Sequence, residues 1–127
     1  MAPARHRLRP QRILFVCTGN VDRSRTAEDI YRDDPRYEVR SAGTAPFAET
    51  PVTRDLLIWA DRVFVMCERQ DGHRTLLKMR FPDVKASPVD LDVEDRWKRG
   101  HPDLVKRLLK KLTPHLGAPQ GARQSGR

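Results

Sequence analysis

The chain has 127 residues, the size of one domain with a full hydrophobic core, and no apolar run approaches the ~20 residues needed to cross a bilayer. A hydrophobic content of 38% with 33% charged residues suits a soluble globular protein, and two cysteines without an export signal predict a reducing, cytoplasmic location. The formal net charge of +8 suggests a nucleic-acid-binding protein, but the distribution of the charge does not favour that class.

The excess positive charge lies at the two ends of the chain. Residues 1–12 hold four arginines and residues 117–127 hold two, with no acidic residue in either segment, so the rest of the chain carries only +2. Segments of this composition have little to pack. We predict a flexible basic N-terminal segment (1–12), a folded domain (13–116) and a disordered tail (117–127). Solvated ends are the simpler explanation of the charge; weak, salt-dependent contact with nucleic acid is the alternative.

The first predicted elements are a strand, a loop and a helix that follow one another directly. An apolar run at 13–16 (ILFV) leads into CTGNVDRS at 17–24 and then into a helical pattern from Thr26. A loop between a strand and a helix points successive backbone N–H groups at one spot, where the helix N-terminus adds partial positive charge. Gly19 permits a tight curl, and Arg23 can grip two oxygens with its planar fork. The loop predicts a phosphate cradle formed by Thr18, Gly19, Asn20, Val21, Asp22, Arg23 and Ser24.

Cys17 is expected at the floor of this cradle. The field that attracts a dianion also favours the thiolate form of Cys17, and Ser24 is placed to donate a hydrogen bond to the sulfur. A thiolate beneath a bound phosphate is positioned for in-line attack, with a phosphocysteine as the product. The alternative is an ordinary buried cysteine at a strand end. The register of strand, glycine, serine and helix favours the nucleophile.

The remaining elements alternate along the chain. The first helix should end near Arg32, because Pro35 disfavours helix just before it. Residues 41–44 are predicted as a turn, with Thr50 capping the next helix and Pro51 as its first residue. Further strands are predicted at 37–40, 63–66 and, more weakly, within 84–93; further helices are predicted at 51–60, 71–80 and 102–112. This order predicts an α/β fold, a single doubly wound domain with a four-stranded parallel sheet and helices on both faces. The site would lie at the carboxyl ends of the strands.

Several stretches resemble one known family. ILFVCTGNVDRSRTAEDI (13–30) is similar to the signature of the low-molecular-weight protein tyrosine phosphatases. The similarity continues in VRSAGTAP, WADRVFVM, HRTLLKMRFP, LDVEDRW and PDLVKRLLKKL, and it covers residues 12–116. More narrowly, the chain resembles a shortened bacterial branch of the family. The resemblance implies a protein-tyrosine phosphatase that acts on phosphorylated proteins or small aryl phosphates without a metal or organic cofactor. It also implies that Ser41 hydrogen-bonds Asn20 and supports the cradle.

Hydrolysis of a phosphomonoester requires an acid that protonates the leaving oxygen. A late loop offers four candidates: Asp90, Asp92, Glu94 and Asp95. In the resembled family the acid precedes an aromatic residue in this loop, which implies Asp95, with Asp92 as the second choice. The proline that usually follows the acid is replaced here by Arg96. Trp97 is expected to wall the pocket and stack on an aryl group, or else to cover the last helix.

Asp22 departs from the resembled family, in which this position is often a second cysteine able to form a protective disulfide. A carboxylate beside Arg23 opposes anion binding, so we expect Asp22 to point outward or to pair with an arginine such as Arg25. Cys67 is predicted to be a core cysteine; the alternative is a resolving thiol, as in arsenate reductases of the same fold. The four histidines lack metal-ligand spacing and are expected to be solvated: His6, His73, His101 and His115.

Three functions therefore remain open on the sequence. The first is a cysteine-dependent phosphomonoesterase that forms a phosphocysteine intermediate. The second is a thiol-dependent arsenate reductase that uses Cys67. The third is a non-catalytic module that binds phosphate or phosphorylated partners through the same loop.

Overall fold

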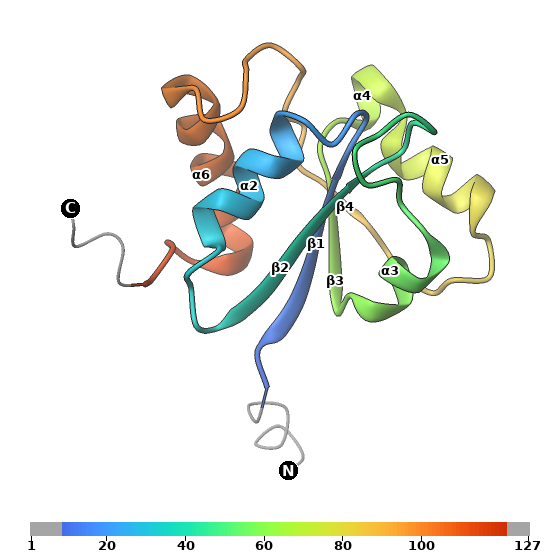
Figure 1. The fold of residues 1–127 in the computed structure, drawn as a ribbon, viewed down its shortest axis with the longest axis horizontal. Helices are drawn as coiled ribbons and strands as arrows, with labels where there is room; N and C mark the ends of the chain where they lie inside the picture. Colours follow the sequence, from blue (N-terminus) through green and yellow to red (C-terminus); the bar gives the residue numbers. More distant parts are fainter. Residues whose placement is uncertain (1–8, 122–127) are drawn as a thin grey trace.

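A computed structural model of the chain describes residues 9–121, so the expectations for residues 1–8 and 122–127 lie outside the described residues. One sheet of four strands forms the centre of the fold (Figure 1). Its strands are β1 (Gln11–Cys17), β2 (Tyr37–Gly43), β3 (Arg62–Val65) and β4 (Val89–Asp90). They lie in the order β2-β1-β3-β4, and every pairing is parallel. The predicted four-stranded parallel sheet is therefore confirmed.

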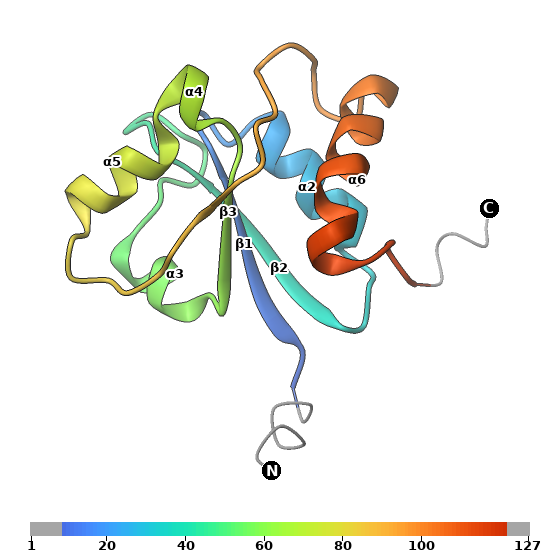
Figure 2. The ribbon, with the colours of Figure 1, turned by 180° about the vertical axis from the view of Figure 1, so that it is seen from behind.

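Helices cover both faces of this sheet (Figures 1 and 2). On one face lie α2 (Arg23–Tyr31) and α6 (Pro102–Leu116), and on the other lie α3 (Arg54–Trp59) and α5 (His73–Arg80). The short α4 (Glu68–Asp71) follows β3 at the carboxyl edge. No helix within residues 9–121 is long and apolar enough to cross a membrane. The doubly wound arrangement matches the α/β prediction.

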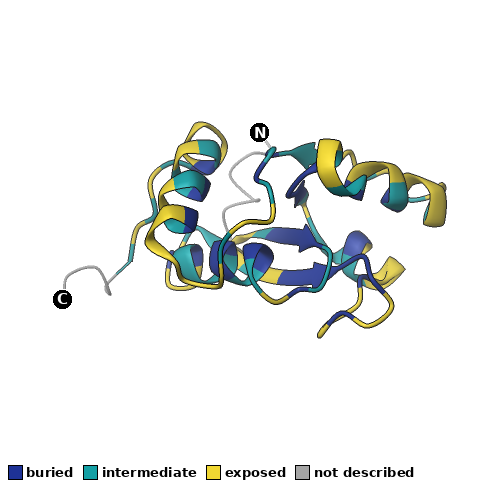
Figure 3. Cartoon of the chain, turned by 90° about the horizontal axis from the view of Figure 1, so that it is seen from above, coloured by how far each residue is buried: buried dark blue, intermediate teal, exposed yellow. Residues whose placement is uncertain are grey.

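The central strand β1 supplies both cores by simple alternation of its side chains. Ile13 and Phe15 pack with the leucines of α6 and with Tyr31 of α2, whereas Leu14 and Val16 pack with residues from α3 and α5. Successive side chains of a strand point to opposite faces, so a run of four apolar residues fills two cores. Figure 3 shows the buried residues on the strands and on the helix surfaces that face them.

Two predicted boundaries near the site are wrong because pairing in the sheet extends further than the local pattern indicates. Residues 41–43 continue β2 instead of turning, since they pair in register with residues 15–17 of β1. The next helix begins at Arg54, capped by Thr53, and not at Pro51 with Thr50 as cap. Pro51 instead forms an isolated parallel bridge with Gly43, whose backbone exchanges hydrogen bonds with Thr50 and Val52.

Other predicted boundaries also change. The helix predicted over 71–80 is α5, which begins at His73, and Gly72, with a φ of 65°, separates it from the unpredicted α4. The fourth strand has two residues, and α6 runs four residues past the predicted Leu112, to Leu116, where the predicted Gly117 ends it. Strand β1 starts at Gln11, inside the predicted flexible segment 1–12. Residues 118–120 of the predicted tail contact Asp34 and Arg36 through hydrogen bonds.

Candidate active site

The loop at residues 17–24 connects the carboxyl end of β1 to the start of α2. The carbonyl oxygens of residues 17–19 accept hydrogen bonds from the N–H groups of Thr44, Ala45 and Glu49, at 2.8, 3.0 and 3.1 Å. Asn20, at φ 57°, turns the chain in the left-handed region. Within residues 9–121, the N–H groups of residues 18–24 donate to no other protein group. Because the 44–49 segment binds the carbonyl oxygens on one side of the loop, the loop amides can bind an oxyanion on the other side.

The tight contact between this loop and β2 requires a glycine. A Cβ atom on Gly43 would lie 2.4 Å from the carbonyl oxygen of Thr18 and 2.6 Å from the Cβ of Ala48. Neither contact is possible in a real structure without a backbone shift. The glycine therefore lets the 44–49 segment lie directly against the loop.

Cys17 is 3% exposed, and its Sγ lies 3.0 Å from the Oγ of Ser24. The Ser24 oxygen accepts a hydrogen bond from the side-chain amide of Asn20 at 2.8 Å. Because that bond uses the oxygen as acceptor, the hydroxyl proton of Ser24 is available to the sulfur. Asn20 also donates to Ser41 at 3.0 Å, as the family resemblance implies. Ser41 in turn donates to Glu28 at 2.5 Å, so a continuous chain of hydrogen bonds ends at the Cys17 sulfur.

Arg23 is 2% exposed and is held by one edge of its guanidinium. Its Nη1 donates to Asp71 at 2.9 Å and to the carbonyl oxygen of Val93 at 3.0 Å. No hydrogen bond among residues 9–121 uses its Nε or Nη2. These two atoms are not among the buried polar atoms that lack a partner, so they remain accessible. This second edge carries two parallel N–H groups, the geometry that binds two oxygens of a phosphate.

His73 belongs to the site, although the sequence predicted a solvated side chain. It is fully buried at the start of α5, and its Nε2 lies 2.8 Å from the Oγ1 of Thr18. Its Nδ1 accepts a hydrogen bond from the backbone N–H of Cys67 at 3.1 Å. The prediction is wrong because it tested the histidines only for the spacing of metal ligands. That spacing does not reveal the contact of His73 with Thr18, which lies 55 positions earlier in the chain. The one local signal for the position of His73 is Gly72, which ends α4 and makes this histidine the first residue of α5.

The four acidic residues of the late loop have different surroundings. Asp90 accepts backbone N–H bonds from Glu68 and Asp92, and Glu94 pairs with Arg107. Asp92 pairs with Arg69, and the hydrogen bond from Arg69 lowers the pKa of the Asp92 carboxyl, which makes it a poorer proton donor. Among residues 9–121, no hydrogen bond or ion pair occupies the carboxylate of the exposed residue Asp95, whose backbone N–H donates to Gln70 at 2.8 Å. Of the four, Asp95 is thus the one whose carboxylate no protein group within residues 9–121 binds.

Asp22 points away from the cradle, as expected, and its side chain is partly exposed; the alternative, an ion pair with Arg25, is not formed. Its Oδ1 accepts the backbone N–H of Arg99 at 2.8 Å, while Arg25 pairs with Glu28 and Glu49. Two loops approach each other here, so the carboxylate that points out of the cradle bonds the segment before α6.

Trp97, Val21 and Cys67 are placed as follows. Trp97 is half-buried against the core cluster beneath α2 and α6, with its ring 6.5 Å from that of His101. Val21 is 47% exposed in the loop.

Cys67 is a free, buried cysteine, as predicted, whose Sγ lies 3.6 Å from the Oδ1 of Asp92. Burial raises the pKa of the Cys67 thiol. No cluster of three metal-ligating side chains is present within the described residues.

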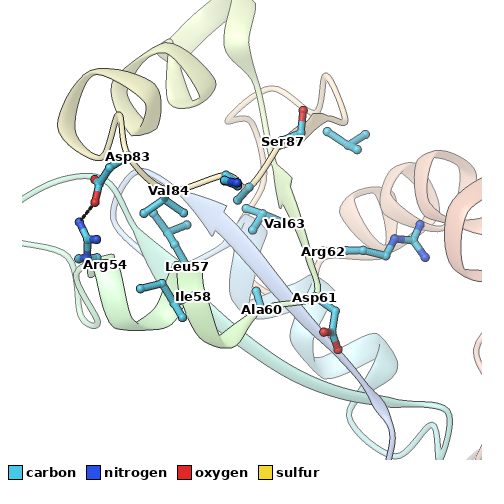
Figure 4. A pocket seen from close by; sticks show the side chains of 13 residues that line it. Arg54, Leu57, Ile58, Ala60, Asp61, Arg62, Val63, Asp83, Val84 and Ser87 are labelled. Carbon is cyan, nitrogen blue, oxygen red and sulfur yellow. Dashed lines mark ion pairs between the residues drawn. The ribbon is translucent and has the colours of Figure 1, made fainter. Parts of the chain in front are cut away.

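A cavity of about 580 Å³ lies far from the loop, at the amino end of β3 (Figure 4). Residues of α3 and of the 83–87 segment line it, and an ion pair between Arg54 and Asp83 joins its two sides. It shares no residue with the cradle. The geometry of the loop, and not this cavity, therefore defines the candidate active site.

Comparison with known proteins identifies the family of the chain. The family model described as "Low molecular weight phosphotyrosine protein phosphatase" matches residues 12–61, which include the whole loop. A protein-arginine-phosphatase of Geobacillus stearothermophilus is 30% identical over 150 aligned positions, which cover 87% of this chain and 99% of the relative. The alignment is longer than the chain, so this chain lacks stretches that its relative has.

Two solved structures have the same fold. The YwlE arginine phosphatase from Geobacillus stearothermophilus superposes with a TM-score of 0.61 at 25% identity, over 83% of this chain and 92% of that one. A low molecular weight protein tyrosine phosphatase from T. tengcongensis also gives 0.61, at 23% identity, over 80% and 92%. The chain belongs to the low molecular weight phosphotyrosine protein phosphatase family. It is a hydrolase of that type.

Proposed function

We propose that this protein hydrolyses phosphomonoesters of tyrosine in proteins, with Cys17 as the nucleophile. The observation that carries the proposal is the hydrogen bond between Ser24 and the Cys17 sulfur inside a ring of amides that no protein group occupies. A sulfur stabilised in this way beneath an oxyanion site is arranged for attack on phosphorus.

The reaction has two steps, and one acid serves both. In the first, the Cys17 thiolate attacks phosphorus and the bond to the leaving oxygen breaks, while Asp95 donates its proton to that oxygen. In the second, the Asp95 carboxylate takes a proton from water, which attacks the phosphocysteine and releases phosphate and the thiolate. Arg23 and the loop amides bind the three phosphoryl oxygens in both steps. The Ser24 hydroxyl stabilises the sulfur as it leaves.

The surroundings of the cradle favour an aromatic leaving group over the phosphoguanidinium of phosphoarginine. Two apolar side chains are exposed, Val21 in the loop itself at 47% and Phe47 in the segment bound to the loop at 81%. Phe47 lies in the 44–49 segment, which backbone hydrogen bonds hold against the loop. An exposed apolar rim binds an aryl ring better than a hydrophilic, charged guanidinium group. The relative named as an arginine phosphatase makes phosphoarginine the competing substrate.

The test compares the two substrates on matched peptides. We expect hydrolysis of para-nitrophenyl phosphate, and a kcat/KM for a phosphotyrosine peptide at least tenfold above that for the phosphoarginine peptide. Phe47→Ala should raise KM for the phosphotyrosine peptide severalfold and leave a small alkyl phosphate unaffected; Met79→Ala, exposed on α5, is the matched control. A preference for phosphoarginine would reject tyrosine specificity. Full turnover by Cys17→Ser would reject the mechanism.

The alternatives are separable by two further measurements. Arsenate reduction requires Cys67 to react as a thiolate, whereas its burial and raised pKa disfavour that form. Cys67→Ser should leave phosphatase turnover almost unchanged and would abolish a reductase. A non-catalytic binding module would bind vanadate or phosphate and show no burst of para-nitrophenol at high protein concentration.

A further inference from the structure

We propose that His73 is a positioning residue of the phosphate cradle: its neutral imidazole, held in one tautomer by the backbone of Cys67, donates a hydrogen bond that fixes Thr18. Thr18 follows the nucleophile directly, and its N–H is the first amide of the ring. The proposal rests on the proposed function of the same loop, and it adds a residue that the sequence pattern of the loop does not contain.

The hydrogen bonds determine the tautomer. The backbone N–H of Cys67 can only donate, so Nδ1 of His73, 3.1 Å away, must carry a lone pair. In a neutral imidazole the proton then lies on Nε2. Nε2 is 2.8 Å from the Oγ1 of Thr18, which therefore accepts this proton. The side chain is fully buried, so water does not compete for either nitrogen.

Thr18 is consequently held at two points. Its carbonyl oxygen accepts the N–H of Ala45 at 3.0 Å, and its side-chain oxygen is hydrogen-bonded to His73 at the start of α5. The first anchor restricts the Thr18–Gly19 peptide plane, which carries the Gly19 N–H, and the second restricts the Thr18 side chain. An amide that must meet a phosphoryl oxygen loses much of its effect when it moves by a fraction of an ångström.

The neutral state of His73 matches its electrostatic surroundings. Asp71 lies 3.8 Å from Nε2 of His73, but the same carboxylate oxygen is bound by Arg23 at 2.9 Å. A charged imidazole would place a second cation beside Arg23 and would direct an Nδ1–H at the N–H of Cys67. Burial, followed by the charge of Arg23, lowers the pKa of His73 to about 4. The segment that ends α4 and starts α5 thus supports Arg23 through Asp71 and Thr18 through His73.

Two substitutions separate the two hydrogen bonds of His73. The Asn side chain in His73→Asn reaches as far as Nδ1, so it keeps an acceptor for Cys67 and loses the donor to Thr18. The Gln side chain in His73→Gln reaches as far as Nε2 and keeps a donor for Thr18. Thr18→Val removes the acceptor itself. His115→Asn, on the exposed surface of α6, is the matched control.

The experiment measures kcat, KM and the vanadate inhibition constant of these variants with para-nitrophenyl phosphate. We expect kcat to fall about tenfold in His73→Asn and in Thr18→Val, because each loses one buried hydrogen bond at the cradle. His73→Gln should restore kcat to within about threefold of the original. The double variant with His73→Asn and Thr18→Val should be no worse than either single variant. His115→Asn should match the original protein.

Equal kcat values for His73→Asn and His73→Gln, or additive losses in the double variant, would overturn the proposal. A lower melting temperature of His73→Asn at unchanged kcat would also overturn it, because that is the result of a purely structural role. An independent measurement uses Cys17→Ser, which has no turnover. Nitrogen-15 spectra should show Nε2 protonated and Nδ1 bare at neutral pH; the opposite tautomer contradicts the proposal. If the original protein has no phosphatase activity, the same spectra and the vanadate affinities still decide the role of His73.

Discussion

The Oδ1 of Asp22 accepts the backbone N–H of Arg99 at 2.8 Å and so joins the phosphate loop to the segment before α6. Two further contacts strengthen this junction: Gly100 donates to Thr26 at 3.0 Å, and Arg99 pairs with Asp29. The segment follows Asp95 directly. Asp22 therefore connects the phosphate loop to the segment that follows Asp95, the acid that we propose.

Substitution of Asp22 should separate its charge from its hydrogen bond. Asp22→Asn keeps an acceptor for Arg99 and removes a negative charge beside Arg23, so KM for a phosphate dianion should fall severalfold at low salt. Asp22→Ala removes the hydrogen bond as well, and kcat should fall because the Asp95 segment loses an anchor. Steady-state kinetics at two ionic strengths check both effects. An increase of KM in Asp22→Asn would contradict the electrostatic part.

Removal of the Asp71 carboxylate should weaken phosphate binding. Arg23 donates to Asp71 through Nη1, and this contact directs the Nε and Nη2 edge, to which no group within residues 9–121 is hydrogen-bonded. In Asp71→Ala we expect the vanadate inhibition constant to rise about tenfold to a hundredfold, the cost of one charge-assisted hydrogen bond. Isothermal titration with vanadate checks this, with Asp55→Ala on the exposed surface of α3 as control. Unchanged affinity would show that packing alone orients Arg23.

Substitution of Asp95 should depend on the leaving group. Asp95→Asn cannot protonate the leaving oxygen, so kcat for a phenyl phosphate with a poor leaving group should fall on the order of a hundredfold or more. The loss should be smaller for para-nitrophenyl phosphate, whose leaving group needs little protonation. Asp92→Asn should change kcat far less, because Arg69 occupies that carboxylate. A leaving-group series measured on both variants assigns the acid, and equal effects would reject Asp95.

The buried imidazole of His73 predicts a loss of stability in mild acid. Its pKa is lowered from 6.5 to about 4 in the folded protein, so the unfolded chain binds more protons between these values. Stability should therefore fall as pH drops from 6.5 to 4, by on the order of 3 kcal/mol, with no further loss from this group below that range. Burial alone would raise the pKa of Asp34, but hydrogen bonds from Arg36 and Gln120 outweigh burial and lower it. The stability that such a carboxylate contributes is lost at still lower pH, when it binds a proton.

Denaturant unfolding of the original protein and of His73→Gln at several pH values checks this prediction. The variant lacks the titrating group, so its stability should be flatter between pH 6.5 and 4. If the free energy of unfolding depends on pH in the same way in both proteins, the pKa of His73 is not lowered by burial, and the prediction is wrong.

Local patterns were enough to predict the central parts of this protein. The alternation of Ile13 to Val16 predicts a strand that feeds two cores, and residues 17–24 predict the anion loop because strand, glycine and helix start are all local signals. The apolar stripe of the last helix is present as Leu104, Leu108 and Leu112, since its period of 3.6 residues is also local. Ser41 and Asp95 were reached through the family resemblance, not through spacing.

The tertiary structure alone decided which distant side chains complete the site. Thr18 and His73 are 55 residues apart, and Asp22 and Arg99 are 77 apart, so no local period relates them. Residues 41–43 were mistaken for a turn because their extended form depends on pairing with β1. A sequence determines contacts within one element through the period of its backbone. Contacts between elements depend on how the sheet orders them, and here that order places α4 and α5 beside the loop and makes a buried histidine part of the site.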